Sequence, residues 1–391
     1  MSYSASMTGR LVFINQATGY LTIDIINEFS NNYKDIVLIT GSIRVQNRPL
    51  NPDVKVKYII RYDRGNNFRK ALSWFIGTIQ IYFLLKFRYE DYEKFFFTIP
   101  PPAYLLSPNL KSAFSILIYD LYPEALKAYG LIEEGIIYRW WSEKNKKVFS
   151  KSHIIYTLSE NMKSQILSYS GTAIVKVIPN WSAFSGLLPV RKEQNSIIKN
   201  EGLTGKFVVQ YSGNIGVTHN VDTIIEVAES LSGYSDIVFQ VIGRGEKSKA
   251  IRKLVGDKRL KNCKLLPFRS DDLLYESLCA ADLAIITLDN KTSDISVPSK
   301  LYNIMAAGLP VMAIAPLNSA ISEIISQNKI GKTFEKDNLR GMCEYIIELK
   351  NNPSLRLCLS EHSFSASRNF TRSNANKYFQ YYNEVKSEFR L

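Results

Sequence analysis

The sequence predicts two doubly wound α/β domains in tandem, each built on a mostly parallel sheet. Apolar runs of strand length alternate with helical patterns along the whole chain, and this is the first observation behind the prediction. The second is a polar, aperiodic stretch at 181–205 that divides the alternation into two series and suits a linker. The third is the length of 391 residues, of which 46% are hydrophobic and 22% charged, enough for two cores.

The first series of elements fills residues 1–180, which we expect to form the N-terminal domain. Short apolar runs predict strands, in chain order, at 11–15, 36–40, 54–60, 95–99, 114–119, 154–157 and 173–178. Helical periodicity predicts helices between them at 23–31, 68–87, 134–149 and 160–169.

The second series fills residues 206–368, which we expect to form the C-terminal domain, followed by a last segment at 369–391. Strands are predicted at 206–211, 236–242, 262–266, 283–287 and 311–314. Helices are predicted at 221–230, 247–255, 272–280, 300–307, 320–326, 339–351, 354–369 and 371–389. In such sheets ligands bind beyond the carboxyl ends of the strands, so the residues that follow each strand are informative about function.

Cysteine and histidine usage argues against a structural metal site. The four cysteines show no CxxC spacing and the chain has only three histidines. This usage is typical of a protein from a reducing cytosol. The first residues, MSYSASMTGRLVFIN, lack the basic-then-apolar layout of a signal peptide, so we do not expect secretion.

Part of the net charge of +13 lies at 55–94, where nine basic residues stand against four acidic ones. An apolar stretch inside this region, 71–87, is interrupted by polar residues and reaches only the lower limit of a membrane span. Two other interpretations are favoured: a helix packed on the sheet, and a helix whose outer face dips into an anionic membrane surface. Its aromatic residues and flanking arginines favour the membrane surface. No nucleic-acid-binding module is recognisable, so we do not expect nucleic acid as a partner.

Four strand ends of the second domain predict a site for a nucleoside diphosphate. They carry Gly213–Gly216, Gly243–Glu246, Phe268–Asp271 and Pro298–Lys300. Glycines let a ligand approach the backbone, and helix N-termini offer N–H groups to phosphate. Each loop alone is more often a simple turn, but four in order on one domain favour a binding site. The spacing fits neither the dinucleotide GxGxxG pattern nor a P-loop.

The segment SVPSKLYNIMAAGLPVMA adds a lysine at the start of a helix. Pro298 suits a first helical turn, and Lys300 stands where free N–H groups would meet an anion. A capped core helix with an incidental lysine is the alternative for this segment taken alone. Gly308 and Pro310 end the helix before the next buried strand.

At this point the chain resembles the retaining glycosyltransferases of the GT-B fold, family 4. The motifs are VIPNW, YSGNIGVTHNVDTIIEVAESL, VIGRGEKSKAI, LPFRSDDLLYESLCAADLAIITL and SVPSKLYNIMAAGLPVMA, with ILIYDLYPEALKAYGLI and IIYTLSENMKSQI in the first half. They are most similar to the bacterial branch that builds O-antigen and capsule sugars, and they cover about residues 110–390.

The resemblance implies two Rossmann-like domains that face each other across a cleft, with C-terminal helices that cross back to the first domain. It also implies a metal-independent hexosyltransferase without a cofactor, which takes a nucleotide-sugar, usually a UDP-sugar, and a lipid-linked saccharide acceptor. Such an enzyme would be cytoplasmic and peripheral at the inner face of the cell membrane.

Carried over position by position, the resemblance also implies individual site residues, with Asp120 and Lys300 as the catalytic pair. The implied residues are Gly213, Asn214, Gly216, His219, Ser299 and Lys300 for the donor pyrophosphate; Gly243, Arg244, Phe268 and Arg269 for the base; Asn303 for the ribose; Asp120 for the transferred sugar or the acceptor hydroxyl; and Gly19 for closure over the phosphate from the first domain.

The chain departs from the family pattern at the cations of the diphosphate site. Many members have Arg and Lys where this chain has Asn214 and His219. Lys300, with Arg244, would then have to match the charge of the leaving diphosphate. His219 would contribute either as a protonated group or as a neutral donor.

A second departure concerns the two glutamates of the last motif, whose positions are Ile295 and Asn303 here. Asn303 can still accept a hydrogen bond from a ribose hydroxyl through its carbonyl oxygen. Ile295 cannot contact a sugar through a carboxylate, so nearby Asp294 is the candidate for that contact. No DxD-like acidic pair stands at a strand end, so the chemistry needs no metal.

Alternatives remain for single residues and for the function. Asp120 is either a site residue or the cap of a helix at 121–129, Glu124 is expected as a solvated acid, and Trp140 and Trp141 as packing residues or an acceptor-lipid contact. The function is either a glycosyltransferase, a UDP-sugar 2-epimerase of the same fold, or a non-catalytic sugar-nucleotide binder. The scarcity of histidines argues against the epimerase.

Overall fold

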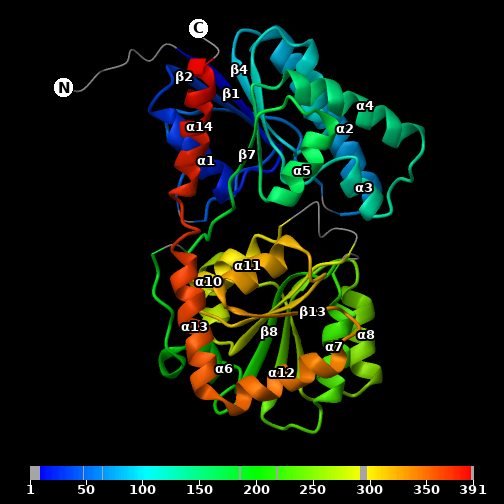
Figure 1. Cartoon of the computed structure of the whole chain (residues 1–391), viewed down its shortest axis with the longest axis vertical. Helices are drawn as coiled ribbons and strands as arrows, with labels where there is room; N and C mark the ends of the chain where they lie inside the picture. Colours follow the sequence, from blue (N-terminus) through cyan, green and yellow to red (C-terminus); the bar gives the residue numbers. More distant parts are fainter. Residues whose placement is uncertain are drawn as a thin grey trace, which may run out of the picture. The chain divides into compact units, whose positions relative to one another are not determined.

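The chain forms two compact units, each with its own parallel sheet, in a computed structural model that describes residues 9–46, 48–63, 65–184, 186–216, 219–290 and 297–388 (Figure 1). Unit 1 comprises Met1–Ala183 together with Arg372–Leu391, and unit 2 comprises Phe184–Thr371. The predicted fold class, two Rossmann-like α/β domains, is confirmed.

Unit 1 holds a seven-stranded parallel sheet in the order β3-β2-β1-β4-β5-β6-β7. Its strands are β1 (Arg10–Ile14), β2 (Asp35–Thr40), β3 (Lys55–Tyr58), β4 (Glu93–Phe97), β5 (Phe114–Leu117), β6 (Ile154–Thr157) and β7 (Val175–Val177). Its helices are α1 (Tyr20–Ser30), α2 (Asn67–Phe87), η1 (Pro101–Asn109), α3 (Glu124–Ala128), α4 (Ile136–Lys151), α5 (Glu160–Tyr169) and α14 (Asn374–Glu388). The order reverses at β1, so the loops after β1 and β4 diverge there, as at a ligand-binding switch point.

The last helix, α14, belongs to the core of unit 1 although it lies almost 200 residues beyond the rest of that unit in the sequence. It packs beside α1, shown in red and blue in Figure 1. The Tyr382 ring lies 5.4 Å from that of Phe29, and Tyr156 donates a hydrogen bond of 2.7 Å to the carbonyl of Tyr378. Lys386 and Tyr382 both bond to the carboxylate of Glu93. These buried contacts anchor the chain end on the sheet.

Helix α2 buries a narrow face of small and aliphatic residues: Ser73, Gly77, Ile81 and Leu85. Asn66 caps it by accepting a hydrogen bond from the amide of Arg69. One face of α2 is therefore buried within unit 1, where α2 contacts η1. Within the described ranges, no helix combines the length and apolar character needed to cross a membrane.

Unit 2 holds a six-stranded parallel sheet in the order β10-β9-β8-β11-β12-β13. Its strands are β8 (Phe207–Asn214), β9 (Ile237–Arg244), β10 (Cys263–Leu266), β11 (Leu283–Thr287), β12 (Val311–Ile314) and β13 (Gly331–Phe334). Its helices are η2 (Lys192–Gln194), α6 (Ser196–Asn200), α7 (Val221–Ser230), α8 (Ser248–Asp257), α9 (Asp271–Cys279), α10 (Lys300–Ala306), α11 (Ala320–Asn328), α12 (Leu339–Asn351) and α13 (Pro353–Ser367). The core lies between α7, α12 and the β8–β9 region of the sheet.

The structure differs from the predicted elements in three places. Segment 181–205, expected to be an aperiodic linker, contains η2 and α6, and the side chain of Trp181 is fully buried. Asn195 caps α6 and donates a hydrogen bond of 2.8 Å to the carbonyl of Glu276, so this segment is tied to α9. The edge strand β13 was not predicted, because its sequence GKTF has no apolar run. The 3₁₀ helix η1 was also not predicted.

Candidate functional site

Strands β8 and β9 pair with each other up to their last residues, and this pairing brings two of the predicted glycine turns together. Gly213 pairs with Gly243, and Asn214 pairs with Arg244. A Cβ on Gly243 would lie 1.9 Å from the carbonyl oxygen of Gly213, so only glycine allows this approach. The amide of Ile215 then donates to the carbonyl of Arg244 at 3.0 Å and holds the turn after β8.

Lys300, the first residue of α10, places a buried ammonium beside the Gly213 turn. Its Nζ lies 4.1 Å from the centre of the Tyr211 ring and 3.1 Å from where a Cβ on Gly213 would stand. Nζ is shielded from solvent and makes no hydrogen bond with any described residue. Burial lowers the pKa of Lys300 to about 7. An ammonium without a carboxylate partner in such a place is suited to receive an anion.

His219 flanks the same turn as a neutral group. A Cβ built on Gly216 would lie 3.3 Å from Nδ1 of His219. It would lie 2.6 Å from Nδ2 of the Asn214 side chain. Burial, followed by the positive charges of Lys300 and Lys247, lowers the pKa of His219 to about 4. Of the two roles left open by the sequence, the neutral imidazole is therefore the one that applies at neutral pH.

Arg244 and Phe268 form a second pair next to this cluster. The guanidinium carbon of Arg244 lies 5.7 Å from the centre of the exposed Phe268 ring. A planar cation and an aromatic ring so placed can hold a flat base between or against them. Arg269, predicted to act beside them, instead has its guanidinium paired with Glu201, which also accepts a hydrogen bond of 2.7 Å from Gln240. Its side chain therefore serves the packing of unit 2.

The remaining predicted donor residues lie at the start of α10. Ser299 is the exposed N-cap residue and its side chain makes no capping hydrogen bond. Asn303 lies one turn further along α10, partly buried. Asp294 and Ile295 fall outside the described residues. The structure thus gathers Gly213, Asn214, Gly216, His219 and Lys300 into one cluster, with the Arg244–Phe268 pair beside it through the β8–β9 pairing.

Tyr211 is a site residue that the motif comparison missed. Its ring lies under the Lys300 ammonium, and its hydroxyl donates a hydrogen bond of 2.6 Å to the carbonyl of Asn214. The sequence contained a signal for it: side chains two residues apart on a strand lie on the same face of the sheet, so Tyr211 and Gly213 share one face.

Asp120, the predicted catalytic carboxylate of unit 1, follows β5 and is partly buried. Burial raises the pKa of Asp120 to about 6, and the charge of Lys70 opposes that rise. Helix α3 begins only at Glu124, with Pro123 as its N-cap and no side-chain cap, so the alternative of a helix-capping Asp120 is wrong. The charge of Asp120 in turn raises the pKa of the Tyr129 phenol.

Other residues of unit 1 fall into structural roles. Glu124 is half-buried and accepts hydrogen bonds from the hydroxyls of Tyr169 and Tyr138, so the expectation of a solvated acid is wrong. Trp141 is buried and donates to the Tyr104 hydroxyl at 2.9 Å, which confirms its packing role, whereas Trp140 is 52% exposed.

Gly19 caps α1 after β1. A Cβ there would meet no atom within 4 Å. Across the described part of the chain, no group of three or more His, Cys, Asp or Glu side chains is placed to hold a metal ion.

Parts of the chain are similar to known proteins. Residues 193–365 match the family described as "Glycosyl transferases group 1". "Probable glycosyltransferase WbjE" of Pseudomonas aeruginosa is 27% identical over 241 residues, which cover 59% of this chain and 59% of that protein. "Putative colanic acid biosynthesis glycosyl transferase WcaI" of Escherichia coli K12 is 27% identical over 223 residues, covering 53% and 52%. The chain thus spans little more than half the length of these relatives.

Among solved structures, "Crystal structure of Anabaena Alr3699/HepE in complex with UDP-glucose" superimposes with a TM-score of 0.72 at 14% identity, covering 97% of this chain and 100% of that one. The match extends over both units and shows a common fold. Residues 193–365, which contain every donor-site candidate of unit 2, therefore match the group 1 glycosyl transferases, and the chain as a whole has the GT-B fold of its solved neighbours.

Proposed function

We propose that the chain is a retaining glycosyltransferase that moves a hexose or N-acetylhexosamine from a UDP-sugar to a lipid-linked or oligosaccharide acceptor in bacterial surface polysaccharide synthesis. The observation that carries the proposal is the buried Lys300 ammonium, which has no hydrogen-bond partner among the described residues and lies against the Gly213 turn. A diphosphate placed there would supply the missing negative charge.

The donor half of the reaction follows from the residues of unit 2. Transfer breaks the bond between the anomeric carbon and the diphosphate, so negative charge grows on the leaving oxygen. Lys300 and the backbone N–H groups of the Gly213–Gly216 turn would stabilise that charge, with neutral His219 as a further hydrogen-bonding group. Retention follows if the new bond forms on the same face, with the hydroxyl proton passing to the leaving phosphate oxygen. This route needs no metal and no pair of glycosidase carboxylates.

The choice of UDP rests on the Arg244–Phe268 pair and on the neighbour solved with UDP-glucose. A base resting on the Phe268 ring would gain stacking energy at little conformational cost, because the 5.7 Å contact with Arg244 already orders the pair. Asn303 is our candidate for the ribose contact. Asp120, whose pKa of about 6 leaves it mostly ionised at pH 7, is our candidate for contact with the acceptor hydroxyl or the sugar.

The lipid-linked acceptor fits the outer face of α2. Six large apolar side chains are exposed along this helix at successive spacings of four, three, four, four and four residues: Phe68, Leu72, Phe75, Ile79, Phe83 and Phe87. Basic residues stand at both ends of the row, Arg69 at the first turn and Lys86 and Arg88 at the last. An apolar stripe flanked by cations is the pattern of a helix that lies in an anionic membrane surface, here the inner face of the cell membrane.

The membrane proposal is tested by co-sedimentation of the protein with vesicles of pure phosphatidylcholine or of phosphatidylcholine with phosphatidylglycerol. We expect binding to the anionic vesicles, and at least a tenfold loss of binding for Phe75→Glu with Phe83→Glu. The matched control is Leu357→Glu, an equally exposed apolar residue of unit 2. Equal binding of both variants would contradict the proposal for α2.

The transferase proposal is tested by incubating the protein with radiolabelled UDP-sugars and a bacterial lipid extract. We expect label to appear in the lipid fraction, and Lys300→Ala to abolish it. Free epimerised sugar would instead favour the UDP-sugar 2-epimerase. Binding of UDP-sugar without turnover would favour the non-catalytic binder.

A further inference from the structure

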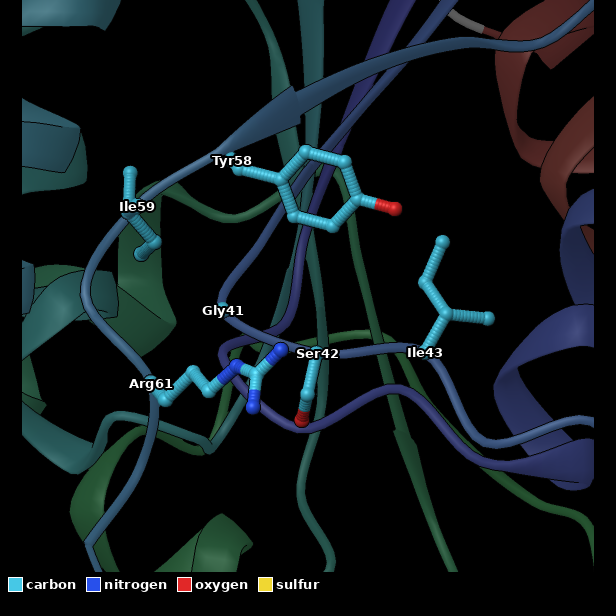
Figure 2. A pocket seen from close by; sticks show the side chains of 6 residues that line it. All are labelled: Gly41, Ser42, Ile43, Tyr58, Ile59 and Arg61. Carbon is cyan, nitrogen blue, oxygen red and sulfur yellow. The ribbon is translucent and has the colours of Figure 1, made fainter.

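Unit 1 contains a cavity of about 500 Å³ at the carboxyl ends of β2 and β3, and none of the donor-site candidates of unit 2 lines it. We call it the β2–β3 pocket. Its lining residues are Gly41, Ser42, Ile43, Tyr58, Ile59 and Arg61, which Figure 2 shows together. Cavities of this size hold small ligands such as one or two sugar rings.

The backbone around the β2–β3 pocket is fixed, so the cavity is preformed. The amide of Gly41 donates to the carbonyl of Gln16 at 3.0 Å, and the amide of Ile59 donates to Thr40 at 2.9 Å. A Cβ on Gly41 would lie 2.4 Å from the carbonyl oxygen of Ile60, so the close approach of the two strand ends requires glycine. A preformed site loses little entropy when it binds a ligand.

The side chains of the pocket supply one cation and one aromatic face. In Figure 2 the Arg61 side chain extends toward Ser42, with the Tyr58 ring above them in this view. Arg61 is exposed and makes no ion pair with any described residue, whereas Lys55, on the strand β3 that precedes it, is paired with Asp35. Tyr58 is 63% exposed. A guanidinium fork matches a carboxylate or a phosphate, and an exposed phenol ring offers a flat surface to a sugar ring.

We propose that the β2–β3 pocket binds a negatively charged group of the acceptor saccharide, with Arg61 on the oxyanion and Tyr58 against the attached sugar ring. This inference rests on the proposed function, which it deepens by giving the acceptor a charge. The oxyanion has two possible sources, the carboxylate of an acidic sugar or the phosphate that links a saccharide to its lipid. Both present oxygens that a guanidinium can bind in the same way.

The test measures binding of three soluble probes, D-glucuronate, glucose 1-phosphate and D-glucose, by saturation-transfer NMR with excess UDP present to occupy the donor site. We expect at least one anionic probe to bind about 10-fold or more tightly than glucose, and Arg61→Gln to reduce it to the level of glucose. Preference for glucuronate identifies an acidic sugar, and preference for glucose 1-phosphate identifies a phosphate. Arg139→Gln, an exposed arginine on α4, is the matched control and should bind as the wild type does.

Equal binding of glucose and both anions, or unchanged binding by Arg61→Gln, would overturn the proposal. Because Arg61 is exposed, Arg61→Gln should keep the wild-type Tm, and Tyr58→Leu provides a second variant that should weaken all sugar-bearing probes. UDP binding measured on the same samples keeps the two proposals apart. A loss of anion binding with UDP binding intact supports the pocket whether or not the transfer assay succeeds.

Discussion

Each unit has an ionisable side chain near the carboxyl end of a parallel strand, Lys300 near the end of β8 and Asp120 after β5. The charges around the two side chains differ. In unit 2 the Lys300 ammonium is buried against an aromatic ring without a hydrogen-bond partner in the described chain, and its pKa falls to about 7. In unit 1 Asp120 is partly buried, and burial raises its pKa to about 6 although the charge of Lys70 opposes that rise. Burial moves both groups toward their neutral forms.

The difference between Lys300 and Asp120 indicates which of the two groups lacks a charge that a ligand would supply. The charge of Lys70 acts on Asp120 and partly compensates its negative charge. The positive charge of Lys300 is not balanced by a negative group among the described residues. A bound diphosphate would compensate that charge and keep the amine protonated. Among the described residues Lys300 therefore lacks a compensating negative group, whereas the charge of Lys70 acts on Asp120.

The largest expected effect is that of replacing Lys300, which tests whether its charge is needed for transfer. We expect Lys300→Ala to lower transfer by about 10³-fold, because the leaving diphosphate loses its main cation. The free energy of unfolding should stay the same or rise, since an uncompensated buried ammonium costs stability. Radiolabel transfer and chemical denaturation measure the two quantities on one sample.

The control for that experiment is Lys249→Ala, an exposed lysine on α8 that makes no contact with the cluster around Gly213. It should transfer sugar at the wild-type rate. Retention of more than a tenth of the activity by Lys300→Ala would remove Lys300 from the phosphate site.

Replacing Asp120 tests the other half. We expect Asp120→Asn to lower kcat by about 10²-fold, in the range of a group that handles a reacting hydroxyl. The affinity for UDP should not change, because Asp120 is not one of the residues that would hold UDP. Steady-state kinetics together with calorimetric titration of UDP separate the two effects. A parallel loss of UDP affinity would instead place Asp120 on the donor.

The pH dependence of UDP binding sharpens the comparison without a mutation. Below pH 7 Lys300 is protonated in the free protein, whereas above it a proton must be taken up for the charged pair to form. The affinity for UDP should therefore fall as the pH rises above 7, by up to about tenfold per pH unit. Lys300→Met should show a flat profile over that interval. A wild-type affinity independent of pH from 7 to 9 would contradict the assignment.

The same titration affects folding with the opposite sign. The pKa of Lys300 is lower in the folded chain than in the unfolded one, so between about pH 7 and 10.5 the unfolded chain binds more protons. The contribution of Lys300 to stability should therefore rise with pH across this interval. Denaturation of wild type and Lys300→Met at several pH values isolates that contribution.

The sequence predicted the fold and most of the residues that lie together around Gly213, because both rest on local patterns. Apolar periodicity located β6, β11 and β12 to the residue, and glycines after strands marked Gly213 and Gly243. The role of Arg269 was not predictable, because its partner Glu201 lies 68 residues away and is brought close only by the fold. The β2–β3 pocket was missed for the same reason: Arg61 and Ser42 belong to no motif and come together through strand pairing.

The smallest effect concerns Tyr211, whose ring supports the Lys300 ammonium at 4.1 Å. Tyr211→Leu removes a cation–π contact of about 0.5–1.5 kcal/mol and should weaken UDP binding by about 2- to 10-fold. Tyr211→Phe keeps the ring and loses only the hydrogen bond to the Asn214 carbonyl, so it should bind UDP more tightly than Tyr211→Leu. Combined with Lys300→Met, the leucine variant should have little further effect, because the ring then has no ammonium to support. If the losses of UDP affinity in the two single variants add up in the double variant, Tyr211 acts on UDP independently of Lys300. The uncompensated charge of Lys300 would then not account for UDP binding by itself.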